Sequence, residues 1–255
     1  MHHPSARSRL PRAATAWTLA GAAAATAAVA WWVTDSAPYP YAQHRLLDLP
    51  LPFLSQRRLE RLLRPVPGQR VLEVGPGTGL QALRTAPLLG PRGRLDIVDV
   101  QQQMLDHVLR QADAQGLRTI VPTLADASEL PFETGVFDSA YLVTTLGEIP
   151  DVPAALRELR RVLKPGGRLV VGEFFDRHQV RPAALARHAN AAGLHLRAVY
   201  GPPLAYFALL APCATVPDPP STALRTASGT ARGSAGPTPG PDAGATDSDP
   251  RAAPC

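Results

Sequence analysis

Apolar runs alternate with longer segments of helical spacing through the middle of the chain. The short runs are rich in Val, Leu and Ile, which is typical of buried strands. We expect strands at 70–74, 94–99, 119–122, 137–143 and 168–174. Because helical patterns separate these strands, the sequence predicts an α/β fold in which helices cover both faces of a mostly parallel sheet.

The pattern changes after residue 194. Two extended stretches follow each other up to residue 210 and are joined by Gly201-Pro202-Pro203, with no helical segment between them. Strands joined by so short a connection must run antiparallel. We therefore predict an antiparallel hairpin at the end of the sheet.

The two ends of the chain differ from this middle part. Residues 13–33 form an uncharged run of 21 residues with tryptophans at both ends, and as a helix this run would measure about 30 Å, enough to cross a membrane. A signal sequence or a mistaken start would look similar. At the other end, residues 213–255 contain mainly Pro, Gly, Ser, Thr and Ala. Such a composition predicts a disordered tail.

The distribution of charge bears on the orientation of the expected anchor and on the class of partner. Arginines before residue 13 favour export of the rest of the chain, but arginines at 45, 57 and 58 weaken that bias. We favour a cytoplasmic catalytic domain, anchored by residues 13–33. The net charge of +5 comes from arginines scattered among acidic residues, so we expect no nucleic-acid partner. No histidine pair within the folded part has the spacing of a metal site, and we expect no metal.

A glycine-rich turn follows the first predicted strand. The segment V-L-E-V-G-P-G-T-G places glycines at 75, 77 and 79, where backbone can approach a ligand closely. The dinucleotide-binding pattern G-x-G-x-x-G would need a glycine in place of Leu80, and the only lysine, Lys164, is too distant for a phosphate loop. The turn therefore favours a different ligand.

Two aspartates extend this site. Asp99 ends the second strand and can accept hydrogen bonds from both hydroxyls of an adenosine ribose. Asp126 follows the third strand and could accept from an adenine amino group, although capping of a helix is the alternative.

These segments resemble the motifs of class I S-adenosylmethionine-dependent methyltransferases of the ubiquinone and menaquinone biosynthesis type. V-L-E-V-G-P-G-T-G, V-D-V-Q-Q-Q-M-L, A-D-A-S-E-L-P-F, F-D-S-A-Y and R-V-L-K-P-G-G-R-L-V-V appear in family order within 65–212. The resemblance implies a Rossmann-like sheet of seven strands with the last antiparallel, and S-adenosyl-L-methionine as cofactor. The residues that it assigns to cofactor binding are Glu73, Gly75, Gly77, Gly79, Asp99, Met104, Asp126 and Ala127.

Methyl transfer from a sulfonium needs mainly proximity and orientation, because the leaving group is already activated. A general base is needed only if the acceptor must lose a proton, and the candidates near the expected strand ends are Glu148, Glu173 and His178. For Glu148 a surface role near a helix start is the alternative, and Glu173 could be satisfied by backbone amides. The Lys164–Gly167 segment is expected to be a structural turn between helix and strand.

No long insertion follows the fifth strand, so residues 34–64, including a helix around 59–63, are expected to close over the acceptor as a lid. Apolar residues there, with Phe174, Phe175 and Tyr206, would suit a small or lipid-like hydrophobic acceptor. The alternatives are a catalytically silent, cofactor-binding membrane protein and a nicotinamide-dependent oxidoreductase.

Overall fold

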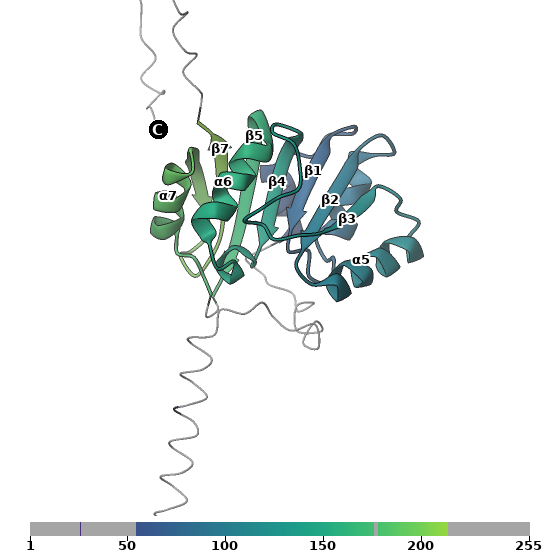
Figure 1. Ribbon diagram of the computed structural model, residues 1–255, viewed down its shortest axis with the longest axis horizontal. Coiled ribbons are helices and arrows are strands. Elements are labelled where there is room, and N and C mark those ends of the chain that lie inside the picture. Colours follow the sequence, from purple (N-terminus) through teal and green to yellow (C-terminus); the bar gives the residue numbers. More distant parts are fainter. Residues whose placement is uncertain (1–25, 27–54, 176–177, 214–255) are drawn as a thin grey trace, which may run out of the picture.

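The computed structural model describes residues 55–175 and 178–213, and Thr26. Within these residues seven strands form a single sheet in the order β3-β2-β1-β4-β5-β7-β6 (Figure 1). The strands are β1 (Arg70–Val74), β2 (Arg94–Asp99), β3 (Ile120–Leu124), β4 (Phe137–Val143), β5 (Leu163–Phe174), β6 (Leu194–Tyr200) and β7 (Ala205–Pro212).

Strand direction confirms the predicted fold class. Strands β1 to β5 pair in parallel, whereas β7 runs antiparallel to both of its neighbours, β5 and β6. β6 and β7 form the predicted hairpin. Parallel strands end at the same edge of a sheet, so the segments that follow β1, β2 and β4 lie close together there.

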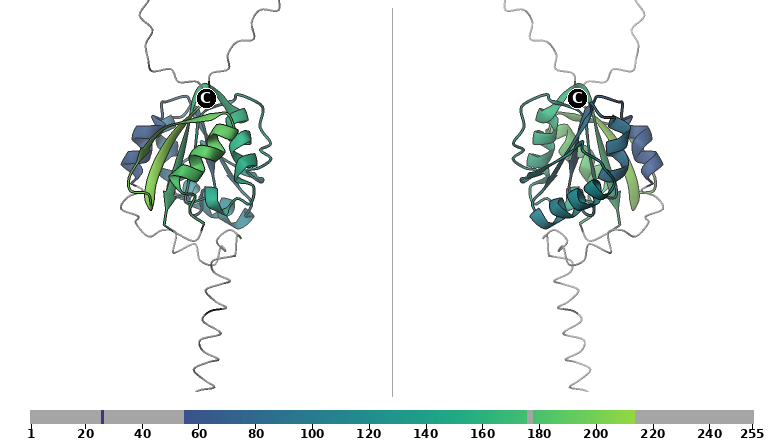
Figure 2. Two further views of the ribbon diagram at one scale, coloured as in Figure 1. Left: turned by 90° about the vertical axis from the view of Figure 1, so that its left-hand side faces the viewer. Right: turned by 90° about the vertical axis from the view of Figure 1, so that its right-hand side faces the viewer.

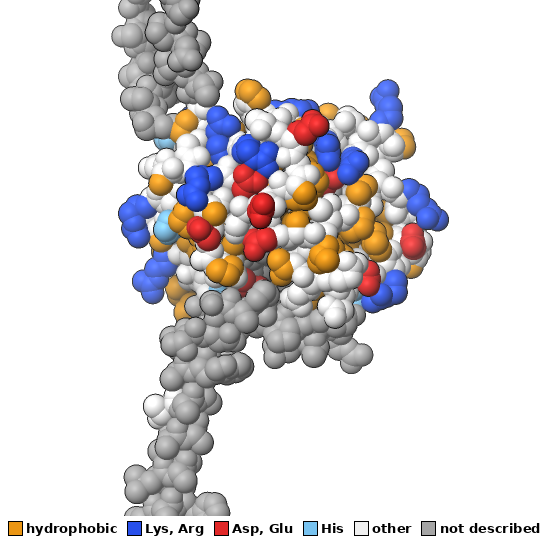
Figure 3. All heavy atoms as spheres, in the orientation of Figure 1, with side chains coloured by type: hydrophobic (Ala, Val, Ile, Leu, Met, Phe, Trp, Pro, Cys, Tyr) orange, Lys and Arg blue, Asp and Glu red, His pale blue; other side chains and the backbone are white. Residues whose placement is uncertain are grey.

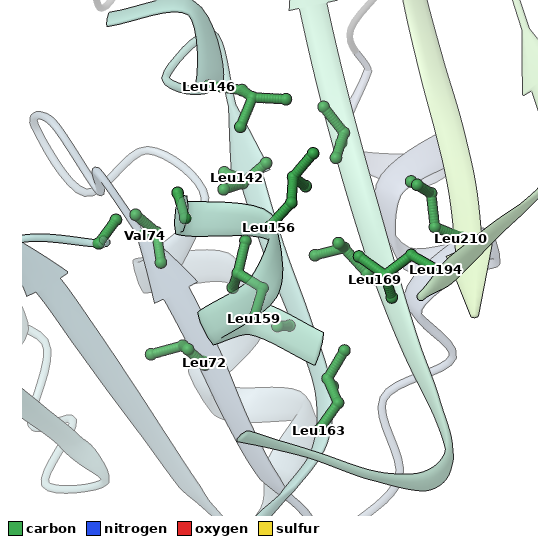
Figure 4. Close-up of a cluster of buried hydrophobic side chains, with 14 of the residues drawn as sticks. Leu72, Val74, Leu142, Leu146, Leu156, Leu159, Leu163, Leu169, Leu194 and Leu210 are labelled. Carbon is green, nitrogen blue, oxygen red and sulfur yellow. The ribbon is translucent and has the colours of Figure 1, made fainter. Parts of the chain in front are cut away.

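Helices cover both faces of the sheet (Figure 2). One face carries α3 (Gln56–Leu63), α4 (Ala82–Thr85), η2 (Ala86–Leu89) and α5 (Gln102–Ala114). The other face carries α6 (Val152–Val162) and α7 (Pro182–Ala191), and the short η3 (Leu146–Glu148) follows β4. Leucines of α6 pack between side chains of β1, β4 and β5 in the core of this second face (Figure 4). The α6 helix begins at Asp151, whose Oδ1 accepts from the Ala154 amide at 2.8 Å.

Two strand boundaries differ from the sequence prediction. β3 starts at Ile120 and continues to Leu124. β5 begins at Leu163, so the expected turn Lys164–Gly167 belongs to the strand as an irregularity: the pairing with β4 passes from Leu163 directly to Arg168. The Lys164 Nζ donates to Asp138 Oδ1 at 2.7 Å, which agrees with a structural role for this segment.

The predicted terminal segments lie outside the described residues: the 13–33 run apart from Thr26, most of 34–64, and the tail after Cys213. The described part of 34–64 contains α3, whose buried leucines pack against β4, β5 and β7. Among the described residues no helix is long and apolar enough to cross a membrane. On the face seen in Figure 3, acidic and basic side chains interleave.

Candidate active site at the carboxyl edge of the sheet

The turn after β1 needs glycines for its backbone conformation. Gly75, Gly77 and Gly79 have φ values of 66°, 52° and 87°, in the left-handed region that disfavours other residues. The Gly75 amide donates to the Val98 carbonyl at 2.8 Å, which joins the turn to β2. A side chain at position 75 would overlap that of Thr145, whose hydroxyl donates to the Gly75 carbonyl at 3.2 Å. The turn is therefore fixed between the ends of β2 and β4.

Glu73 lies beneath this turn on the face covered by α3, α4 and α5. Only 2% of its surface is exposed, and its Oε2 accepts the Tyr141 hydroxyl at 2.7 Å. Burial raises the pKa of Glu73 to about 8; the Tyr141 hydrogen bond opposes this rise, and the negative charge of Asp99 adds to it. A carboxyl group with so perturbed a pKa is typical of a functional site.

Asp99 lies at the end of the neighbouring strand β2 and is half-buried. Its Oδ1 accepts the Gln101 amide at 2.9 Å, and burial raises its pKa. Since β1 and β2 pair in register from Arg70↔Arg94 to Val74↔Val98, both acids lie near the glycine turn. The structure thus brings together three of the predicted elements.

The third-strand aspartate has a local role. Asp126 is exposed, and its Oδ1 accepts from both the amide and the hydroxyl of Ser128 at 2.7 Å. These hydrogen bonds lower its pKa. Asp126 therefore closes a local turn, and no helix begins there. Helix capping, the alternative role, is wrong, and adenine binding stays a prediction. Ala127 and Met104 are buried, at 5% and 3% exposure, and Met104 lies in the first turn of α5.

The three candidate bases lie near the ends of β4 and β5. Glu148 ends η3, Glu173 is buried near the end of β5, and His178 follows β5. A side chain at Gly147 would overlap the His178 carbonyl, so the segment after β4 packs against the segment after β5. Whether any of the three acts as a base stays a prediction.

The backbone amide and the backbone carbonyl of Val180 are each hydrogen-bonded to a buried side chain. Glu173 Oε2 accepts the Val180 amide at 3.0 Å, and the buried Tyr206 donates its hydroxyl to the Val180 carbonyl. Glu173 therefore accepts a hydrogen bond from a backbone amide, which is the alternative to a role as general base. Burial raises the pKa of Tyr206, and the charge of Glu173 adds to that effect.

Two polar contacts of the sheet were not predicted from the sequence. One is the Tyr141–Glu73 hydrogen bond. The other surrounds the fully buried Asp96, which binds Arg70 through Nε at 2.9 Å and Nη2 at 3.1 Å, and Arg94 through Nη2 at 2.6 Å. The Arg70 guanidinium also lies over the Phe137 ring, 4.8 Å from its centroid. The Tyr141–Glu73 and Arg70–Asp96 bonds join strands, so alternation along one strand could have suggested only that these polar residues face inward. Arg94 and Asp96 lie two residues apart on β2, where alternation does place both side chains on one face.

The part of the chain that the structure describes contains no candidate metal site, because no three acidic, histidine or cysteine side chains gather there. The expected cofactor site depends on backbone and carboxylates alone.

Solved structures share this fold. A SAM-dependent methyltransferase from Aquifex aeolicus superimposes with a TM-score of 0.61 at 20% identity, over 68% of this chain and 98% of that one. The [4+2]-cyclase SpnF gives a TM-score of 0.53 at 27% identity, over 66% and 63%. A geranyl diphosphate C-methyltransferase from Streptomyces coelicolor A3(2) gives 0.53 at 14% identity, over 62% and 77%.

Sequence comparison is more specific. The ubiquinone/menaquinone biosynthesis C-methyltransferase UbiE of Coxiella burnetii is 40% identical over 108 residues, 42% of this chain and 43% of that protein. UbiE of Vibrio cholerae is 38% identical over 111 residues, 42% of each protein. The matched segment thus spans less than half the length of these relatives. A model of the ubiE/COQ5 methyltransferase family matches residues 46–187, more than half of the chain. The chain belongs to the ubiE/COQ5 methyltransferase family.

Proposed function

We propose that this protein transfers a methyl group from S-adenosylmethionine to a carbon atom of a small, hydrophobic acceptor. One observation carries the proposal: Glu73, the glycine turn and Asp99 lie together at the carboxyl edge of the sheet, inside the segment that matches the family. In open α/β sheets this edge is where ligands bind.

The residues present fit such a cofactor. Glu73 offers a buried carboxylate to an ammonium group, and Asp99 offers a carboxylate to two ribose hydroxyls. The glycines at 75, 77 and 79 give the turn its left-handed backbone, and Thr145 and Val98 keep the turn in place. Met104 and Ala127 would supply apolar contacts to the adenine.

The bound sulfonium would supply an activated methyl group, and the chain would supply position. Glu73 at the end of β1 and Asp99 at the end of β2 would fix the orientation of the cofactor. The acceptor can then be aligned in line with the methyl carbon. A new bond from the methyl group to a ring carbon is balanced by loss of the proton on that carbon, and electron donation from the ring oxygens makes the carbon nucleophilic. Glu148 and His178, beside the edge where the acceptor would enter, are the candidates to accept the proton, and Glu173 holds the Val180 amide there.

The acceptor class is inferred from the relatives. The UbiE proteins of Coxiella burnetii and Vibrio cholerae are named C-methyltransferases of ubiquinone and menaquinone biosynthesis. Phe175, which follows β5, is 63% exposed, and an aromatic side chain at this edge suits an apolar ring. We therefore favour a quinone-like acceptor.

A second candidate is cofactor binding without methyl transfer. It is favoured by the likeness to SpnF, a [4+2]-cyclase that is 27% identical over 66% of this chain. The cofactor residues alone do not separate a methyltransferase from such a protein.

The test uses the full chain. Calorimetric titration with S-adenosylmethionine and with NAD compares the cofactors, and labelled-methyl transfer is then measured into the reduced (quinol) forms of demethylated quinones and into lipid extracts. We expect S-adenosylmethionine alone to bind and label to enter the organic phase. Binding without transfer to any extract would support the second candidate, and preference for NAD would overturn both.

The membrane anchor is tested separately. Deleting residues 1–33 should move the protein from the membrane to the soluble fraction without loss of cofactor binding, because the cofactor residues begin at Glu73. A full-length protein found wholly in the soluble fraction would contradict the anchor.

A further inference from the structure

Tyr141 is the group that holds Glu73 in place. The two residues are register partners in the parallel pair β1–β4, so their side chains leave the same face of the sheet side by side. Tyr141 is fully buried, and its hydroxyl donates to Glu73 Oε2 at 2.7 Å. This bond orients one carboxylate oxygen and leaves the other, Oε1, without a hydrogen bond from any residue that the structure describes.

Among the residues that the structure describes, no positive charge is paired with Glu73. Its face of the sheet is built from apolar side chains such as Val71, Val170 and Phe207, and within the described ranges Glu73 forms no ion pair. The nearest charge that acts on it is Asp99, which is negative and raises the pKa of Glu73 further. A buried carboxyl group in such a place is stabilised by a proton or by a cation that enters with a ligand.

We infer that Tyr141 is a positioning residue for the cofactor: by holding Glu73 Oε2 it directs Oε1 to the ammonium group at the amino-acid end of the ligand. This inference rests on the proposed function, because it takes Glu73 to face the cofactor. It adds that the pair Glu73–Tyr141 selects ligands that carry the ammonium group over ligands that lack it.

Two nucleosides separate this role from a structural one. S-adenosylhomocysteine carries the amino-acid end, whereas 5′-methylthioadenosine shares the adenine, ribose and sulfur but lacks it. In the full-length protein, Tyr141→Phe should weaken binding of S-adenosylhomocysteine about tenfold, the usual effect of one hydrogen bond to a charged group, and leave binding of methylthioadenosine within about twofold. Calorimetric titration measures both affinities.

Tyr206→Phe is the matched control. It removes another buried tyrosine hydroxyl, bonded to the Val180 carbonyl on the other face of the sheet, so it tests the cost of losing such a bond in the core. The ratio of the two ligand affinities should not change in this variant. In a Glu73→Gln background, Tyr141→Phe should no longer change the ratio, because the carboxylate that it positions is gone.

Three results overturn the inference. They are equal loss of both ligands in Tyr141→Phe, no loss of either, and a Glu73→Gln variant that keeps the wild-type preference for S-adenosylhomocysteine; the last remains decisive should Tyr141→Phe not fold. A wild-type protein that binds neither nucleoside refutes instead the proposed function itself.

Discussion

Asp96 and Glu73 are both buried carboxylates on neighbouring strands, yet their surroundings are opposite. Asp96, on β2 near the amino edge of the sheet, is enclosed by the guanidinium groups of Arg70 and Arg94. Glu73, on β1 near the carboxyl edge, receives only the Tyr141 hydroxyl. A completed ion pair is a structural feature, whereas an incomplete one indicates a place for a charged ligand. Removing each charge should therefore have effects of opposite sign.

The largest effect is expected for Asp96→Asn. It leaves two guanidinium groups without their carboxylate, and breaking a buried ion pair costs about 3–5 kcal/mol. Because the Arg70 and Arg94 side chains are 32% and 44% exposed, we expect the lower end, about 3 kcal/mol, or a melting temperature lower by roughly 6–12 °C. Calorimetry measures the melting temperature. A variant as stable as the wild type would contradict the structural role of the Asp96 ion pairs.

Asp99→Ala should act on the ligand and not on the fold. Loss of the hydrogen bonds that a carboxylate accepts from ribose hydroxyls costs about 1.5–3 kcal/mol each, so affinity for S-adenosylmethionine should fall at least about tenfold. Asp99→Asn, which keeps one acceptor oxygen, should lose less. The melting temperature of the folded variants is the control, and unchanged affinity in Asp99→Ala would remove this residue from the site.

Glu73→Gln should stabilise the ligand-free protein, in contrast to Asp96→Asn. Folding raises the pKa of Glu73 from 4.5 to about 8, so between these values the folded state binds the proton that the unfolded state has lost. The free energy of unfolding of the wild type therefore falls as pH rises through this range. The variant should show no advantage near pH 4 and an advantage of about 1–2 kcal/mol at pH 8, less than the full pKa shift implies because the new amide needs partners. Denaturant unfolding at a series of pH values measures this, and a difference independent of pH would contradict it.

The smallest effect is expected for Arg94→Gln. Arg94 is the more exposed of the two arginines, and Asp96 keeps its two bonds from Arg70 in this variant. We expect a loss of about 1 kcal/mol or less. Arg70→Gln, which also removes the contact with the Phe137 ring, should cost more; the reverse order would show that Arg94 is the principal partner.

Local patterns along the chain predicted the parts of the fold that depend on local signals. The bounds of β1, β2 and β4 match the sequence prediction. The apolar runs of β1 and β2 end at Gly75 and Asp99, and that of β4 ends before the two threonines at 144 and 145. The start of β5 was missed because Lys164–Gly167 has the composition of a turn, although Leu163 before it pairs with Phe137. Composition alone does not show which partner strand lies beside such a segment.

The same limit applies to the site. The glycine turn and Asp99 were predicted from their spacing, and the structure brings them together with Glu73. The Tyr141–Glu73 bond joins residues 68 apart in sequence, and it depends on the register of β1 against β4, which no periodicity records. For Asp126 the sequence left adenine contact and helix capping open. The structure shows instead a local turn with Ser128, which a short polar side chain forms without outside help.

The fastening of Val180 has a consequence for engineering. Its amide and carbonyl are bound by Glu173 and Tyr206, and its own side chain packs against the core. Substitutions at 178 and 179 remove neither of these bonds, although they replace the candidate base His178 and the Gln179 side chain, whose Nε2 donates to the Pro203 carbonyl at 3.1 Å. A library at these two positions, with Glu173 and Tyr206 kept, offers a route to new acceptor preferences on an unaltered cofactor scaffold.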